Sequence, residues 1–410
     1  MYISNLMRMF AYNRRGKNAI QSLAIITLSS GWVMIYADRL SISPVLNLIK
    51  QQFGLTFVSV SLVVSVYFLA YVGFTIPATV AAERWGYKKI MLAFFTLAAL
   101  SLAAAGLLGY SYLLLVIFMG LHGAGAGAYY PTAYRISGNI ATKRRGLTAS
   151  LINSGMGFGT IIGLLIAGPA LDLFKSWQMM LVILSIPTLL VAIALREATS
   201  EPPKQNRMGK EMIRIYYELF KNRTFVMLCV AMFCSLYGYW VILTWGPTYL
   251  QESKGLGIFY SGATTAIFSA FAIPSSILIS HISDRFGRKM ISTIILPLAS
   301  LSMLLMAVGS SLLMVIVAIA IYGIVGKLTL DPLVIAWIGE AIKEEQIGAS
   351  LSLLNVAAMS SSILAPIITG LLADFTGGLA EGFYFGAAVV LLGSFFVAFA
   401  REGSLLKSRV

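Results

Sequence analysis

The sequence predicts an all-α membrane protein with twelve transmembrane helices in two pseudo-symmetric six-helix halves. Three observations carry this prediction: the composition, the length of the apolar runs and an internal repeat. Of the 410 residues, 58% are hydrophobic and only 11% are charged, which leaves too few charges to solvate a soluble chain of this length. The apolar runs each approach the ~20 residues that cross a hydrocarbon core of about 30 Å.

Six apolar runs precede the longest polar interval of the chain and six follow it. We expect spans at 21–45, 57–81, 88–109, 111–138, 147–171, 177–196, 223–249, 258–281, 289–309, 311–338, 347–373 and 381–401. The first run continues past Tyr36 without a small-residue cleavage site, so it is interpreted as a span and not as a signal peptide. The predicted domains are an N-terminal half (1–197), a cytoplasmic linker (198–222) and a C-terminal half (223–410).

The basic residues are concentrated in short loops between the apolar runs. The chain carries 30 Lys and Arg against 16 Asp and Glu, a net charge of +14, with clusters such as "ATKRRG" and "DRFGRK". This positive-inside distribution places the basic loops and both termini in the cytoplasm, and it requires no nucleic-acid partner. We therefore expect a multi-pass protein of the cell (inner or plasma) membrane that contacts the lipid bilayer. We also expect it to work as a monomer.

The two halves repeat one another. "ERWGYKK" after the second span is echoed by "DRFGRK" after the eighth, with Glu83 and Asp284 separated by 201 positions, and Pro131 and Pro332 are also 201 positions apart. Spans two and eight cross in the same direction, so the repeat is parallel, with an axis along the membrane normal. In that architecture the substrate site lies near the bilayer midplane, where the repeats meet.

At these repeated loops the sequence resembles the major facilitator superfamily. The signature of that family is an acid and an arginine, then a glycine, then basic residues, and it occurs here twice, although Thr79 and Ser280 stand where a glycine is usual. The resemblance implies the major facilitator fold, transport by alternating access and a cytoplasmic gate. The gating residues that it implies are Glu83, Arg84 and Gly86 in the first copy and Asp284, Arg285, Gly287 and Arg288 in the second.

Within that superfamily the sequence is similar to the anion:cation symporter group, which includes sugar-acid carriers and sialin-like organic anion carriers. The likeness lies in "YADRLSIS" of the first span, "TWGPTYL" of the seventh and "YYPTAYRISGNIATKRRGLTAS" of the fourth and its loop. It implies an organic anion as substrate. The chain departs from that group at Ala126 and Met119, which replace a frequent carboxylate and arginine, so the proton-coupling residues of the group cannot be carried over intact.

Lys327 and Asp331 lie in the middle of the tenth span, one helical turn apart. A charge at bilayer depth costs about 2.5 to 3.5 kcal/mol on insertion scales, so such residues usually face a bundle interior or a wet cavity. One interpretation is a structural pair. The other is that Lys327 presents a cation to an anionic substrate while Asp331 tunes it and is a candidate proton carrier. Pro332 favours a cavity, because it removes a backbone donor.

Asp38 and Arg39 lie close to mid-depth in the first span. Neighbouring helical positions are about 100° apart, so the two side chains cannot both point at one site. We expect Arg39 to bind the substrate, because a guanidinium matches a carboxylate bidentately, and Asp38 to pack against a neighbouring span. The alternative is a mutually satisfied structural pair of Asp38 and Arg39. Asp38 is the preferred proton carrier. Arg135, near a span end, is interpreted as snorkelling, and His122 as a packing or hydrogen-bonding residue in preference to a proton relay.

Aromatic and polar stripes at helical spacing complete the predicted site. The candidate substrate-binding side chains from these stripes are Tyr130, Tyr134, Tyr237, Trp240 and Asn355. Packing between helices is the alternative for each stripe. Asn355 is the repeat partner of Asn153, which favours a structural hydrogen bond between helices for both.

The function that these residues favour is secondary active transport of a small organic anion, a carboxylate, coupled to protons. Sodium coupling is disfavoured, because no cluster of oxygen ligands stands out. The sequence shows no nucleophile–base pair, metal cluster or phosphate-binding loop, so we expect no enzyme, no catalytic residue, no metal and no cofactor. One alternative is a drug or amphiphile efflux transporter of the same fold, which leaves the deep cations unexplained. The other is a non-transporting membrane sensor.

Overall fold

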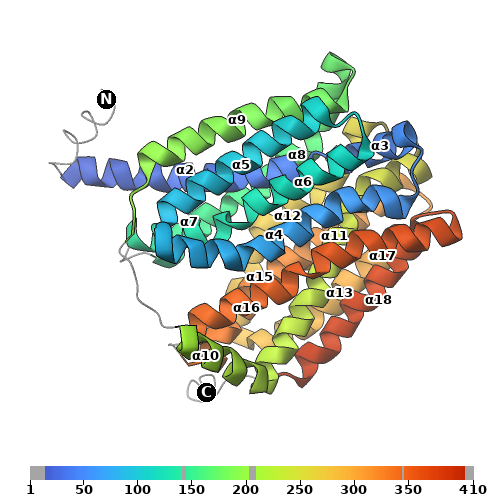
Figure 1. The fold of residues 1–410 in the computed structure, drawn as a ribbon. Helices are drawn as coiled ribbons and strands as arrows, with labels where there is room; N and C mark the ends of the chain where they lie inside the picture. Colours follow the sequence, from blue (N-terminus) through green and yellow to red (C-terminus); the bar gives the residue numbers. More distant parts are fainter. Residues whose placement is uncertain (1–13, 141–144, 203–208, 344–345, 402–410) are drawn as a thin grey trace. The chain divides into compact units, whose positions relative to one another are not determined.

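The computed structural model describes residues 14–140, 145–202, 209–343 and 346–401, and every regular element in these ranges is helical (Figure 1). Within these ranges, twelve helical segments are long and apolar enough to cross a membrane. This confirms the predicted all-α membrane fold with twelve transmembrane helices. The helical character follows from apolar runs that are hydrophobic on all sides, which is typical of helices surrounded by other helices and lipid.

The chain forms two compact units. The first comprises Met1–Val45 and Val66–Gln205, and the second comprises Leu46–Ser65 and Asn206–Val410. The second unit thus includes a short segment from the first part of the sequence. The predicted division into halves on either side of a linker at 198–222 stays a prediction.

The helices of the first unit pack through close approaches of small residues. They are α2 (Arg14–Leu40), η1 (Ser43–Val45), most of α4 (Phe57–Trp85), α5 (Tyr87–Leu108), α6 (Tyr112–Gly127), α7 (Tyr129–Ile140), α8 (Arg145–Phe174) and α9 (Trp177–Ala198). Helix α2 packs against α8 and α9, and α5 packs against α6 and α9. A Cβ on Gly155 of α8 would lie 2.3 Å from the Ser29 carbonyl oxygen of α2, so only glycine permits this contact.

The second unit is built around one buried helix. Its helices are α3 (Leu46–Phe53), α10 (Gly209–Lys221), α11 (Arg223–Lys254), α12 (Ile258–Phe286), α13 (Arg288–Val308), α14 (Leu312–Val325), α15 (Lys327–Ala341), α16 (Ile347–Met359), α17 (Ser361–Thr376) and α18 (Ala380–Phe399). Helix α11 contacts α12, α15, α16, α17 and α18, and its residues from Cys234 to Leu250 are all buried. Helix α10 lies beside α11 and α16 (Figure 1).

Residues 46–65 are held in the second unit by specific contacts. The Asp374 carboxylate of α17 accepts hydrogen bonds from the backbone N–H groups of Phe57 (2.7 Å) and Val58 (2.9 Å) at the start of α4. Lys50 of α3 forms an ion pair with Glu252 of α11 at 2.9 Å. A carboxylate at a helix N-terminus satisfies backbone donors that have no partner within the helix.

Three of the predicted spans are each made of two helices. The fourth span breaks between α6 and α7 at Ala128, the tenth between α14 and α15 at Gly326, and the eleventh between α16 and α17 at Ser360. The sequence predicted continuous spans and attributed local opening of the tenth to Pro332. The break instead precedes Lys327, because Gly326 adopts φ −81° and ψ −160°, outside the helical region.

Candidate functional site

Arg39 of the first unit is buried against aromatic rings. It lies in the last turn of α2 and is only 4% exposed. Its guanidinium carbon lies 3.5 Å from the centre of the Tyr36 ring and 5.5 Å from that of Phe68 on α4. A cation over a ring face is stabilised by the ring quadrupole. The sequence singled out Arg39 but neither of these rings.

Asp38 points away from Arg39, toward α9. Its carboxyl oxygen Oδ2 lies 2.8 Å from the hydroxyl of Thr188, and the residue is fully buried. The same Thr188 hydroxyl lies 2.9 Å from the Leu184 carbonyl oxygen, one turn earlier in α9. The structure therefore places Asp38 against a neighbouring span, as the helical angle between adjacent residues required. No pattern in the sequence had pointed to Thr188 as this partner.

The tyrosines predicted on the fourth span lie together on α7. The Tyr130 and Tyr134 rings are 4.8 Å apart, and Tyr130 lies 6.1 Å from the ring of Trp32 on α2. The Tyr134 hydroxyl donates a hydrogen bond to Asn153 Oδ1 of α8. Asn153 therefore joins two helices, which is the structural role that the repeat suggested for it. A binding role for Tyr130 and Tyr134 stays a prediction.

His122 lies well inside the fourth span, whereas Arg135 lies near its end. His122 of α6 is fully buried, with Nδ1 2.9 Å from the Ala98 carbonyl oxygen of α5 and its ring 5.2 Å from the ring of Tyr67 on α4. Arg135 of α7 has its guanidinium carbon 5.7 Å from the ring of Tyr87, the first residue of α5. Both placements match the interpretations of these two residues as hydrogen-bonding and span-end side chains.

The charged pair of the second unit lies at the break in the tenth span. Lys327 is the first residue of α15, and its Nζ lies 2.5 Å from Asp331 Oδ2. The side chains are 11% and 25% exposed, so the pair is largely shielded. The ammonium also lies 5.4 Å from the ring of Tyr239 on α11. The predicted pair on one helix face is therefore formed, and it too is accompanied by an aromatic ring.

The predicted stripe on α11 splits between two neighbours. Tyr237 is buried, with its ring 5.9 Å from that of Phe385 on α18. Trp240 is also buried, 5.3 Å from the ring of Tyr239, the residue beside Lys327. Only Trp240 thus lies in the same aromatic group as the charged pair. Asn355 of α16 is half-buried, and it has no side-chain hydrogen bond to another described residue.

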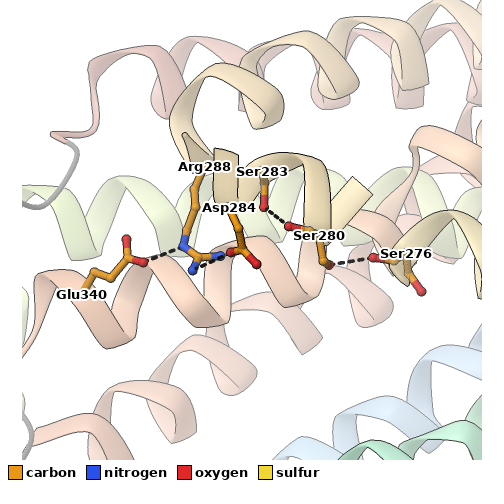
Figure 2. Close-up of polar contacts among 6 residues, drawn as sticks. All are labelled: Ser276, Ser280, Ser283, Asp284, Arg288 and Glu340. Carbon is orange, nitrogen blue, oxygen red and sulfur yellow. Dashed lines mark hydrogen bonds and ion pairs between the residues drawn. The ribbon is translucent and has the colours of Figure 1, made fainter. Parts of the chain in front are cut away.

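The second copy of the repeated loop motif links three helices (Figure 2). Arg288, at the start of α13, lies 3.2 Å from Asp284 of α12 and 2.9 Å from Glu340 of α15. Gly287 between them has φ 92°, a backbone conformation that favours glycine. Arg285 is exposed. Glu340 was missed by the sequence reasoning, although Arg288 was singled out.

The first copy of the motif is held by a different acid. Gly86 has φ 110°, and directly after it the backbone N–H groups of Tyr87 and Lys88 donate to Glu201 at 2.5 and 3.0 Å. The Lys88 ammonium also donates to the Thr199 carbonyl oxygen at 2.6 Å. The chain beyond α9 thus returns to cap α5. The acid and the arginine of this copy, Glu83 and Arg84, are exposed, and a gating role for either copy stays a prediction.

Twelve spans, a twice-repeated loop motif and charged groups buried within the spans define a polytopic membrane transporter. The model of the Major Facilitator Superfamily matches residues 28–326 and 260–408 of the chain. The chain belongs to the Major Facilitator Superfamily and is a multi-pass membrane transporter of that type. The predicted family is thereby confirmed, and the family and its members are transporters, not enzymes.

Named relatives extend over nearly the whole chain. The probable galactarate/D-glucarate transporter GudP of Bacillus subtilis (strain 168) is 24% identical over 404 residues, covering 88% of this chain and 86% of that protein. The hexuronate transporter of the same bacterium is 23% identical over 396 residues, covering 90% and 92%. A solved bacterial homologue of the human lysosomal transporter Spinster, inward-facing and unoccupied, matches the fold with a TM-score of 0.80 at 17% identity, covering 93% and 97%.

Proposed function

We propose that the protein is a proton-coupled carrier of a small organic anion, a carboxylate, that works by alternating access. The observation that carries the proposal is a largely buried cation beside an aromatic ring in each unit, Arg39 and Lys327. Cations at membrane depth are costly, and they usually mark a substrate or ion pathway. Two relatives are named for carrying galactarate, D-glucarate and hexuronates, which are carboxylates.

Arg39 has the chemistry to recognise a carboxylate. The Tyr36 ring covers a face of the guanidinium at 3.5 Å and uses none of its N–H donors. The donors lie in the guanidinium plane, where they form the fork that matches two carboxylate oxygens. The ring also restricts the side chain, so less conformational entropy is lost when an anion binds.

Lys327 offers a second cation whose present partner can be exchanged. Its bond to Asp331 joins two side chains of one helix, and both retain some exposure. A substrate carboxylate that bonds to Lys327 would compete with Asp331 for the ammonium. Asp331 would then lose its cation partner in apolar surroundings, where the neutral, protonated carboxyl is favoured. Anion binding and proton binding would in this way support each other.

Asp38 can serve as the other proton carrier. The Thr188 hydroxyl has one proton and lies within hydrogen-bonding distance of two oxygens, those of Asp38 and Leu184. An ionised Asp38 accepts that proton. When Thr188 donates to Leu184 instead, a protonated Asp38 can donate to the Thr188 oxygen. The contact is therefore compatible with both protonation states, which a carrier needs.

The test is transport by purified protein reconstituted in liposomes. Labelled D-glucuronate, galactarate and sulfoacetate are offered with an interior more alkaline than the exterior, with and without a protonophore. The proposal expects at least one of these anions to accumulate, and the protonophore to abolish accumulation. If none of them accumulates or exchanges while the folded protein carries lipophilic cations outward, the efflux alternative replaces the proposal.

A further inference from the structure

We propose that His122 is a proton-binding group of the first unit, and that it takes up its proton when an anion binds near Arg39. The anion is the one in the proposed function, so the inference rests on that proposal, but it does not depend on which aspartate carries protons. It assigns a second role to a histidine whose visible contact is structural.

The tautomer of His122 follows from its hydrogen bond. Nδ1 lies 2.9 Å from the Ala98 carbonyl oxygen, and a carbonyl oxygen can only accept. Nδ1 therefore carries the proton in the neutral ring, and Nε2 carries a lone pair. Nε2 is buried and has no hydrogen-bond partner in the part of the chain that the structure describes. A proton can bind there without breaking the bond to Ala98.

The surroundings of His122 fix its position. A Cβ on Gly123 would lie 2.0 Å from the Tyr67 carbonyl oxygen of α4, and one on Gly125 would lie 2.5 Å from the Ala98 nitrogen of α5. Helix α6 is thus pressed against both neighbours at this level, which leaves the imidazole between α4 and α5. The titratable ring that faces it is Tyr67.

Two aromatic rings connect His122 to the charge of Arg39. The guanidinium carbon of Arg39 lies 5.5 Å from the Phe68 ring, and the Tyr67 ring lies 5.0 Å from Phe68 and 5.2 Å from His122. Of the helices packed around His122, α5 places the Ala98 carbonyl against it and α4 places the Tyr67 phenol against it.

These positions couple the proton to the anion. A proton on Nε2 creates a second cation near Arg39, and the two repel each other in a poorly screened interior. A bound anion attracts both cations and removes the cost of that repulsion. By linkage, protonation of His122 then strengthens anion binding by the same factor, about 5- to 150-fold if the coupling has the usual size. One proton from solution binds with the anion and leaves with it.

The direct test follows the two histidines of the chain, His122 and His281, by nitrogen NMR. Protein labelled only in histidine is held in lipid bilayers between about pH 5 and pH 8, the range in which imidazole changes charge. Spectra are recorded without added anion and with a mixture of D-glucuronate, galactarate and sulfoacetate. The proposal expects Nε2 of His122 to become protonated at higher pH when the anions are present. An unchanged His122 signal with the mixture would overturn it.

Variants separate this role from a merely structural one. His122→Gln keeps an amide that can donate to Ala98 but cannot titrate, and His281→Gln, at an exposed position of α12, is the matched control. Anion binding by His122→Gln should take up about one proton fewer than binding by the wild type, and His281→Gln should match the wild type. If His122→Gln weakens anion binding by the same factor at every pH, the role of His122 is structural only. If the wild type transports none of the three anions, the proposed function itself is contradicted.

Discussion

The Asp38 carboxyl oxygen lies 2.8 Å from the Thr188 hydroxyl of α9, whereas the neighbouring Arg39 guanidinium lies over the Tyr36 ring. Two adjacent residues thus point to different partners. This arrangement separates the residue proposed to handle a proton from the residue proposed to bind the anion. Each can therefore be changed without removing the other's direct contact.

Asp38→Asn should lower the accumulation driven by a pH difference, because one coupled proton is lost, and it should leave exchange of substrate across the membrane, because exchange needs no net movement of protons. Both are measured in liposomes with labelled D-glucuronate. Asp172→Asn changes an exposed carboxylate of α8 and serves as the control. Accumulation by Asp38→Asn equal to that of the wild type would exclude Asp38 as a carrier and leave Asp331→Asn to be tested in the same way.

Thr188→Val should alter coupling without removing a charge. Valine has nearly the shape of threonine but no hydroxyl, so Asp38 loses the partner that accommodates both of its protonation states. A buried polar group left unsatisfied costs about 1 to 3 kcal/mol, which disfavours the charged carboxylate most. We expect the pH at which accumulation is half-maximal to shift relative to the wild type. An unchanged pH profile would mean that Thr188 has no part in coupling.

Gly287→Ala should destabilise the second unit. At φ 92° a Cβ is strained, and the cost for L-residues with positive φ is about 1 to 2 kcal/mol. Gly339→Ala on α15 is the matched control, because its added Cβ meets nothing within 4 Å beyond its own stretch of helix and its φ is not positive. Thermal unfolding of the purified proteins checks this. Equal melting temperatures for the two variants would show that the backbone conformation at position 287 does not require glycine.

The loop between α4 and α5 should face the cytoplasm, and the loop between α5 and α6 the opposite side. Trp85 (67% exposed) is the last residue of α4, and Tyr110 (74% exposed) lies between α5 and α6. Single cysteines at these positions, in a chain with Cys229 and Cys234 replaced by alanine, are treated in intact cells with a membrane-impermeant thiol reagent. Tyr110→Cys should react and Trp85→Cys should not. The reverse pattern would contradict the topology predicted from the positive residues.

Much of the fold could be predicted from the sequence, because the thickness and the apolar interior of the bilayer determine the length and polarity of each span. The i, i+4 spacing likewise predicted that Lys327 and Asp331 would meet. The break at Gly326 was missed, because a glycine within an apolar run gives no sign that its ψ leaves the helix. From the sequence, the local opening of this span was attributed to Pro332 instead.

The partners of the site residues could not be predicted, because they come from distant parts of the chain. Thr188 meets Asp38 across 150 positions, and Glu201 caps α5 across 114 and 113 positions. Such contacts depend on how helices pack, and a single sequence carries no signal for that. Tyr36, by contrast, lies one helical turn before Arg39, and a search for aromatic residues at that spacing would have found it.

The central claim is that Arg39 and Lys327 bind the substrate anion, and the affinity for D-glucuronate in variants at three positions tests it most directly. Arg39→Ala and Lys327→Ala should each weaken binding about ten- to a hundredfold, since a charge-assisted hydrogen bond contributes about 1.5 to 3 kcal/mol. Arg39→Lys should not fully restore binding, because an ammonium lacks the planar fork. Arg135→Ala, the matched control near Tyr87, should bind almost as the wild type does. Equal, small effects at all three positions in folded, membrane-inserted protein would show that these cations are structural and would contradict the claim.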